Sequence, residues 1–235
     1  MTTVVYVGPT LAAAEVRARL PAADVRGPVA VGDVLALARR PHGVRRIAII
    51  DGYFERMAAV WHKEILLALE RGIAVWGAAS MGALRAAELA PFGMIGVGGI
   101  FRAFARGELV ADDEVAVAHL PEEFGYRAIS DALVNLRDGI ARAPRLTAET
   151  RRRLVELAAA RFYRERSWDR LVADARGAGV PERHVARLAA WPKPDRKAAD
   201  ARLLLARLAR ERPRRPRTVV VPRTWALRQL SAMIR

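Results

Sequence analysis

The order of apolar and polar positions divides the chain into two parts. In the first part, short apolar runs alternate with longer segments in which apolar residues recur every three or four positions. Continuous apolar runs are typical of parallel strands buried on both faces, and the recurring pattern is typical of the helices that cover them. We therefore predict strands at residues 3–7, 45–50 and 73–77, and helices at residues 11–20, 31–40, 61–71 and 80–89.

Alternation of this kind predicts a doubly wound α/β fold with a mostly parallel, Rossmann-like sheet. In the second part of the chain, the pattern predicts helices only. The helix signals there are Thr147 and Ser167 as N-caps, Pro181 in a first turn, and a last helix over residues 196–210. The expected organisation is an α/β core domain over residues 1–143, followed by a basic, mainly helical C-terminal region over residues 144–235.

The distribution of charge along the chain indicates a class of binding partner. The chain has 40 lysine and arginine residues against 25 aspartate and glutamate residues, and all of the excess lies after residue 140. A basic region of this kind favours an anionic partner, either an acidic protein surface or nucleic acid. Nucleic acid is the less favoured of the two, because the region lacks interleaved aromatic residues, zinc-ligand spacing and a helix-turn-helix pattern.

Other features of the sequence narrow the class of protein. The apolar stretches between charges are too short to span a bilayer and the N-terminus lacks the basic segment of a signal peptide, so we expect a cytoplasmic protein without a membrane partner. The sequence contains no cysteine. It therefore excludes disulfides, thiolate metal ligands and a persulfide relay on this chain.

The strongest chemical signal is a serine between a predicted strand and a predicted helix. Ser80 stands in the sequence Ala-Ala-Ser-Met-Gly, with small residues two positions before and two positions after it. A nucleophile elbow requires small residues at these two positions, because its sharp turn lifts the hydroxyl above the sheet. The backbone N–H of Met81 would then serve as an oxyanion donor. The structural alternative is that Ser80 only caps the helix.

Two sets of residues are candidates for the acid and base that would activate this serine. Asp51 ends a neighbouring strand and His62 opens the helix that follows it, so His62 is a candidate base that Asp51 would orient. The usual hydrolase order, with acid and histidine after the serine, instead selects Asp112 or Asp113 with His119. The alternatives are a surface histidine and a solvated acidic turn.

Further polar and small residues near the same predicted edge are candidates for binding. These are Gly8, Pro9 and Thr10 after the first strand, Lys63 and Glu64 beside His62, and Met81, Gly82, Arg85 and Glu88 after Ser80. The first three are placed to bind an anion at a helix N-terminus, but they lack the spacing of a P-loop or dinucleotide motif, so we expect no cofactor. We also expect no metal site. Arg85 and Glu88 either form an ion pair or leave the arginine for an anionic substrate.

Several longer motifs occur in order over about residues 3–140. They read VYVGPTL, IIDGYFE, VWHKEILLALERGIAVWGAASMGALRAAEL, PFGMIGVGGIF, DDEVAVAH and GYRAISDALVNLR. Together they resemble the TfuA-like family. The resemblance implies an ATP-dependent YcaO-type partner that installs a thioamide in a peptide backbone. It also implies a role in supplying the sulfur, by release from a thiocarboxylated ubiquitin-like carrier protein, or in assisting the partner allosterically.

The resemblance and the residues agree on one point of chemistry. Release of sulfide from a thiocarboxylate is acyl-transfer hydrolysis, which suits a serine or an activated water beside an oxyanion donor and needs no cysteine. We therefore expect an accessory protein of thioamidation that hydrolyses a thiocarboxylated carrier. The alternative is a non-catalytic module that docks the YcaO enzyme or its precursor peptide.

Overall fold

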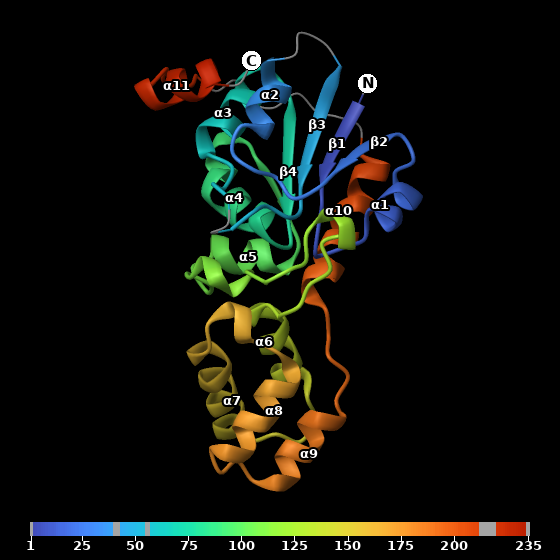
Figure 1. Ribbon diagram of the computed structural model, residues 1–235, viewed down its shortest axis with the longest axis vertical. Coiled ribbons are helices and arrows are strands. Elements are labelled where there is room, and N and C mark those ends of the chain that lie inside the picture. The colour runs from blue at the N-terminus through green and yellow to red at the C-terminus, as the bar shows by residue number, and fades with distance from the viewer. Residues whose placement is uncertain (1, 40–42, 55–56, 212–219, 234–235) are drawn as a thin grey trace. The chain divides into compact units, whose positions relative to one another are not determined.

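The computed structural model describes residues 2–39, 43–54, 57–211 and 220–233 of the chain (Figure 1). These residues belong to two compact units. The first comprises residues 1–110 and 198–235, and the second comprises residues 111–197. The predicted boundary between residues 143 and 144 lies inside the second unit, and the assignment of domains on either side of it stays a prediction.

The first unit is built on a five-stranded parallel sheet with the strand order β2-β1-β3-β4-β5. The strands are β1 (Thr2–Tyr6), β2 (Ala23–Arg26), β3 (Val44–Ile49), β4 (Ala74–Ala78) and β5 (Ile95–Val97). All four pairings are parallel, so the carboxyl ends of the strands lie at one edge of the sheet. The predicted doubly wound α/β class is confirmed.

Helices cover both faces of this sheet. One face packs against α2 (Asp33–Arg39), α3 (His62–Glu70) and α4 (Met81–Leu89), and the other packs against α1 (Ala13–Arg19) and α10 (Arg196–Arg210). Alternation along the strands produces the two cores: Val4 and Tyr6 of β1 belong to the first, whereas Val5 belongs to the second. The unit also contains α5 (Gly99–Ala105) and α11 (Trp225–Met233).

The direction of winding reverses between β1 and β3. From β1 the chain passes through α1 to β2 on one side, and then returns to form β3 on the other side of β1. In open α/β sheets, ligands bind at the carboxyl edge beside such a switch point. The ends of β1, β3 and β4 are therefore the places in the first unit where chemistry is expected.

Helix α10 has the bounds predicted from its pattern, residues 196–210, and it completes a face of the sheet. Its buried residues Ala201, Leu204, Leu205 and Leu208 pack into the second core with Trp76 of β4. Asp200 accepts a hydrogen bond from the backbone N–H of Ile100 at 2.8 Å. A helix that begins about 100 residues after the last strand is thus part of the α/β layer.

The second unit contains the helices α6 (Leu133–Arg142), α7 (Ala148–Ala160), α8 (Trp168–Gly177) and α9 (Glu182–Ala190), packed around one apolar core. The predicted caps are present. The hydroxyl of Thr147 accepts a hydrogen bond from the N–H of Thr150, and that of Ser167 accepts one from the N–H of Arg170. In neither unit does the described part of the chain contain a helix long and apolar enough to cross a membrane.

Candidate functional site

Ser80 follows a tight, strained turn at the carboxyl end of β4. Strand β4 ends at Ala78, and the N–H of Ser80 donates back to the carbonyl oxygen of Ala78 at 2.8 Å. This closure gives Ala79 a φ of +66°. Left-handed backbone costs a non-glycine residue roughly 1–2 kcal/mol, and strain of this kind is concentrated at functional sites. The turn is as sharp as predicted, but Ala79, one residue before the serine, has the strained conformation.

Two glycines let the helix after Ser80 begin directly against the strands. A Cβ atom on Gly82 would lie 1.8 Å from the carbonyl oxygen of Ile49, and a Cβ atom on Gly77 would lie 2.0 Å from the carbonyl oxygen of Gly82. The N–H of Gly82 donates to Ile50 at 3.3 Å. The predicted binding residue Gly82 therefore serves to bring the start of α4 onto the end of β3.

The hydrogen bonds at the start of α4 favour a role for Ser80 as a reactive hydroxyl over a role as a helix cap. Ser80 occupies the N-cap position and is 8% exposed, but its side chain makes no capping hydrogen bond. The N–H of Met81, in the first turn of α4, donates to no acceptor within the described residues. A hydroxyl beside a backbone N–H at a helix N-terminus is an arrangement that can stabilise a developing oxyanion.

Asp51 ties the ends of β1 and β3 together at the switch point. Its carboxylate is 1% exposed. It accepts hydrogen bonds from the N–H of Gly8 at 2.9 Å, the N–H of Thr10 at 3.1 Å and the hydroxyl of Thr10 at 2.6 Å. The loop Gly8-Pro9-Thr10 therefore uses these donors, which were predicted to bind an external anion, to bind the protein's own carboxylate.

His62 pairs with α4 instead of Asp51. Its Nε2 lies 2.8 Å from a carboxylate oxygen of Glu88, and Arg85 donates to the same oxygen at 2.8 Å. Arg85 also donates to the carbonyl oxygen of Val60 at 3.1 Å, so its side chain is only 13% exposed. The expected ion pair between Arg85 and Glu88 is present. The described contacts of His62 include neither Asp51 nor Ser80, so the proposed orientation of His62 by Asp51 is not found in this structure.

The geometry of this pair determines which nitrogen of His62 is available as a base. An ionised carboxylate only accepts hydrogen bonds, so the Nε2 that faces Glu88 must have the hydrogen. In the neutral imidazole, the lone pair then lies on Nδ1. A histidine oriented by a carboxylate in this way has the arrangement of a general base.

The two residues after His62 have structural contacts. Glu64 is fully buried and accepts hydrogen bonds from the N–H groups of Gly32 and Leu35 at 2.8 and 3.2 Å, and from that of Trp61 at 3.0 Å. Burial raises the pKa of Glu64 above its ordinary value, although the three N–H groups oppose this shift. Lys63 donates to the hydroxyl of Thr224 at 3.0 Å.

The alternative acid and base residues belong to the second unit. Asp113 pairs with the buried Arg166 at 2.7 Å, and Asp112 lies exposed beside it. A ring nitrogen of His119 lies 2.8 Å from the carbonyl oxygen of Leu120, and its ring contacts Tyr126 edge to face. Their participation with Ser80 stays a hypothesis. Among the described residues of either unit, no group of histidine, aspartate and glutamate has the geometry of a metal site.

Two features of the site were missed by the sequence reasoning. The strain at Ala79 could not be predicted from the sequence, because an alanine does not indicate a positive φ. The partner of His62 is Glu88, and a signal for it existed: Arg85 and Glu88 occupy one face of α4, where Glu88 was considered only as the partner of Arg85.

The segment that contains the candidate site matches a known protein family. Residues 51–167 match the family model described as TfuA-like protein. The matched segment includes Asp51, His62 and Ser80. A search of curated proteins finds no match to the chain. Through residues 51–167, the chain belongs to the TfuA-like protein family.

Proposed function

We propose that the protein is an accessory factor of peptide backbone thioamidation that releases sulfide from a thiocarboxylated ubiquitin-like carrier for a YcaO-type enzyme. The observation that carries the proposal is the strained turn at Ala79, which presents Ser80 at the carboxyl edge of the sheet beside the N–H of Met81, for which the described residues provide no acceptor. Membership of the TfuA-like family supports the choice of a thiocarboxylate as substrate. The proposed setting is the cytoplasm, with the precursor peptide as a further partner.

The reaction is a hydrolysis in two steps. The hydroxyl oxygen of Ser80 attacks the thiocarboxylate carbon and its proton passes to a base. The carbon–sulfur bond then breaks, and sulfide leaves with that proton as hydrosulfide. Water hydrolyses the resulting ester, which returns the hydroxyl to Ser80 and leaves the carrier with an ordinary carboxylate. The N–H of Met81 donates to the oxyanion that forms in each step.

His62 is the proposed base because Glu88 fixes its proton on Nε2. In the structure, the described side-chain contacts of His62 are with α4. His62 therefore acts on Ser80 through a water, or after substrate binding has brought His62 and Ser80 together. Catalytic hydrogen bonds often shorten only in the complex with substrate. Asp51 is a positioning residue in this scheme, since its carboxylate fixes the loop beside the site.

One observation favours the second candidate function, a docking or allosteric module. The donors of the loop Gly8-Pro9-Thr10, at the position where an α/β sheet usually binds its ligand, are taken by Asp51. A module that docks the YcaO enzyme or the precursor peptide does not require a free ligand-binding loop at that position.

Sulfide release distinguishes the two functions. The assay uses the full chain and a purified thiocarboxylated carrier, and compares Ser80→Ala with Ser167→Ala. Both variants replace a serine at a helix N-cap, but only the side chain of Ser167 caps its helix. Loss of release in the first variant alone supports hydrolysis. Absence of release from the parent, combined with faster thioamidation by the YcaO enzyme when free sulfide is supplied, supports the docking module.

A further inference from the structure

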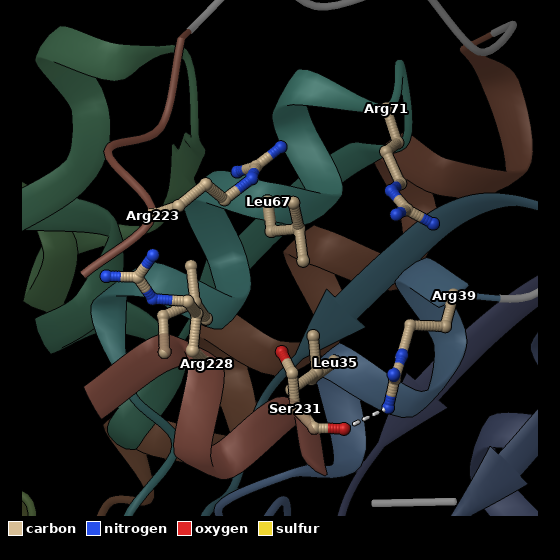
Figure 2. Close-up of a pocket in the computed structure, with 8 residues that line it drawn as sticks. Leu35, Arg39, Leu67, Arg71, Arg223, Arg228 and Ser231 are labelled. Carbon is tan, nitrogen blue, oxygen red and sulfur yellow. Dashed lines mark hydrogen bonds between the residues drawn. The ribbon is translucent and has the colours of Figure 1, made fainter. Parts of the chain in front are cut away.

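Helices α2, α3 and α11 enclose a cavity of about 170 Å³ in the first unit, with arginines around an apolar floor (Figure 2). We call this feature the arginine pocket. Its floor is formed by the buried side chains of Leu35, Leu67 and Leu227, and its rim includes Arg39, Arg71, Arg223 and Arg228. Helix α11 reaches this position because Leu230 packs into the core beneath α2 and α3.

The rim has more positive charge than its described neighbours neutralise. Arg223 pairs with Glu70, whose carboxylate also accepts from the N–H of Val221 at 2.9 Å. Arg71 donates to the carbonyl oxygen of Ala38 at 2.6 Å but pairs with no carboxylate of the described chain. Arg228 is exposed; its backbone N–H donates to Thr224, but its guanidinium group has neither a hydrogen bond nor an ion pair with a described residue. Two guanidinium groups on the rim are thus available for an anion.

Helix stability does not account for both of these groups. Arg71 follows the last residue of α3 and donates to the end of α2, where a positive charge interacts favourably with the helix dipole. Arg228, however, lies inside α11, and its side chain caps no helix. A cation at that position costs side-chain entropy if it is ordered and adds nothing to the packing of the fold.

We propose that the arginine pocket binds an acidic segment of a partner protein, with an aliphatic side chain of that segment on the leucine floor and carboxylates at Arg71 and Arg228. The size fits this occupant, because a cavity of roughly 150 Å³ admits a group as large as benzene. Guanidinium groups form strong, directed hydrogen bonds with carboxylates. The apolar floor favours a peptide over a free inorganic anion.

The lining also disfavours nucleic acid as the occupant. Proteins that bind single strands stack the bases on aromatic side chains, and the lining residues of the pocket include no aromatic ring. The inference does not rest on the proposed hydrolysis. His62 begins α3 and Arg71 follows its end, so the two positions are separated by roughly 13 Å along the helix axis.

The test is fluorescence anisotropy with the full chain and a labelled peptide in which one leucine is flanked on each side by three glutamates. Arg228→Gln is the test variant and Arg17→Gln, an exposed arginine of α1, is the matched control. Loss of a charge-assisted contact predicts about tenfold weaker binding for the first and less than about twofold change for the second. Thermal unfolding of each variant checks that the fold is retained.

Two changed peptides test the two halves of the pocket. Replacing the glutamates by glutamine, or the leucine by alanine, is expected to weaken binding by about tenfold or more. Equal binding of Arg228→Gln and Arg17→Gln overturns the proposal, as does equal binding of the glutamine peptide. Tighter binding of a labelled oligothymidylate, with the same loss in Arg228→Gln, also overturns it in favour of nucleic acid.

Discussion

Asp51 and Thr10 are joined by two hydrogen bonds, from the backbone N–H of Thr10 at 3.1 Å and from its hydroxyl at 2.6 Å. Because Asp51 follows β3 and Thr10 follows β1, the pair closes the sheet at the switch point between these strands. The carboxylate there fixes the loop next to the proposed site instead of orienting a histidine.

This contact predicts different effects for two substitutions of Asp51. Asp51→Ala leaves three buried donors without an acceptor and is expected to lower the free energy of unfolding by about 3 kcal/mol or more. Asp51→Asn keeps an acceptor for the two N–H groups and is expected to cost about 1 kcal/mol. Urea unfolding measures both. We also expect Asp51→Asn to retain sulfide release within about threefold, and a far larger loss in a folded Asp51→Asn variant would restore a catalytic role to the carboxylate.

The strain at Ala79 is testable by comparison with another buried alanine. Glycine adopts positive φ without a Cβ penalty, whereas glycine inside a helix costs about 1 kcal/mol relative to alanine. Ala79→Gly should therefore unfold at an equal or higher urea concentration than the parent. Ala83→Gly, at a fully buried position in α4, should be less stable by about 1 kcal/mol. Equal losses in the two variants would show that the turn is unstrained.

Glu64 is expected to make stability depend on pH. Burial holds the pKa of its carboxyl above the ordinary 4.5, so between 4.5 and the raised value the folded protein binds more protons than the unfolded chain. The free energy of unfolding should therefore fall as the pH rises through this window and then level off. The measurement is the unfolding free energy of the parent minus that of Glu64→Gln, from pH 4 to 8. A value that increases as the pH rises would mean that the three N–H groups lower the pKa of Glu64 more than burial raises it.

The pairing of His62 with Glu88 predicts how sulfide release depends on the two side chains. His62→Ala should reduce the rate by about a hundredfold, as expected for loss of a general base, whereas Glu88→Gln should reduce it less because glutamine still accepts a hydrogen bond from Nε2. Arg85 loses its carboxylate partner in Glu88→Gln, but its bond to Val60 remains. If His62→Ala releases sulfide at the parental rate and His119→Ala does not, the base is His119.

The sequence specified the parts of the fold that local patterns determine. The apolar runs of β3 and β4, the caps at Thr147 and Ser167, and the bounds of α10 were all readable. The strands β2 and β5 and the helix α11 were not predicted. The two strands have only four and three residues, which is too short to show a clear period. The packing of α10 on the sheet could not be predicted either, since an amphipathic period shows that a helix has an apolar face but does not identify what covers it.

The same distinction applies to the site. The position of Ser80 at the end of a strand followed from spacing, as did the place of Asp51 on the neighbouring strand. The partners of Asp51 and His62 did not follow, because each depends on the distance between polar groups more than 20 residues apart in the chain. Sequence order can suggest that two polar groups share an edge of a sheet, but it cannot identify which of them form a hydrogen bond.

The central claim is that Ser80 releases sulfide from a thiocarboxylated carrier, and its most direct test is the rate of that release by Ser80→Ala. Ser80→Ala loses no helix cap, because the Ser80 side chain makes no capping bond, whereas Ser167→Ala should lose about 1 kcal/mol. The account predicts a fall of about a hundredfold or more in Ser80→Ala and a parental rate in Ser167→Ala. Release by folded Ser80→Ala at the parental rate would contradict it.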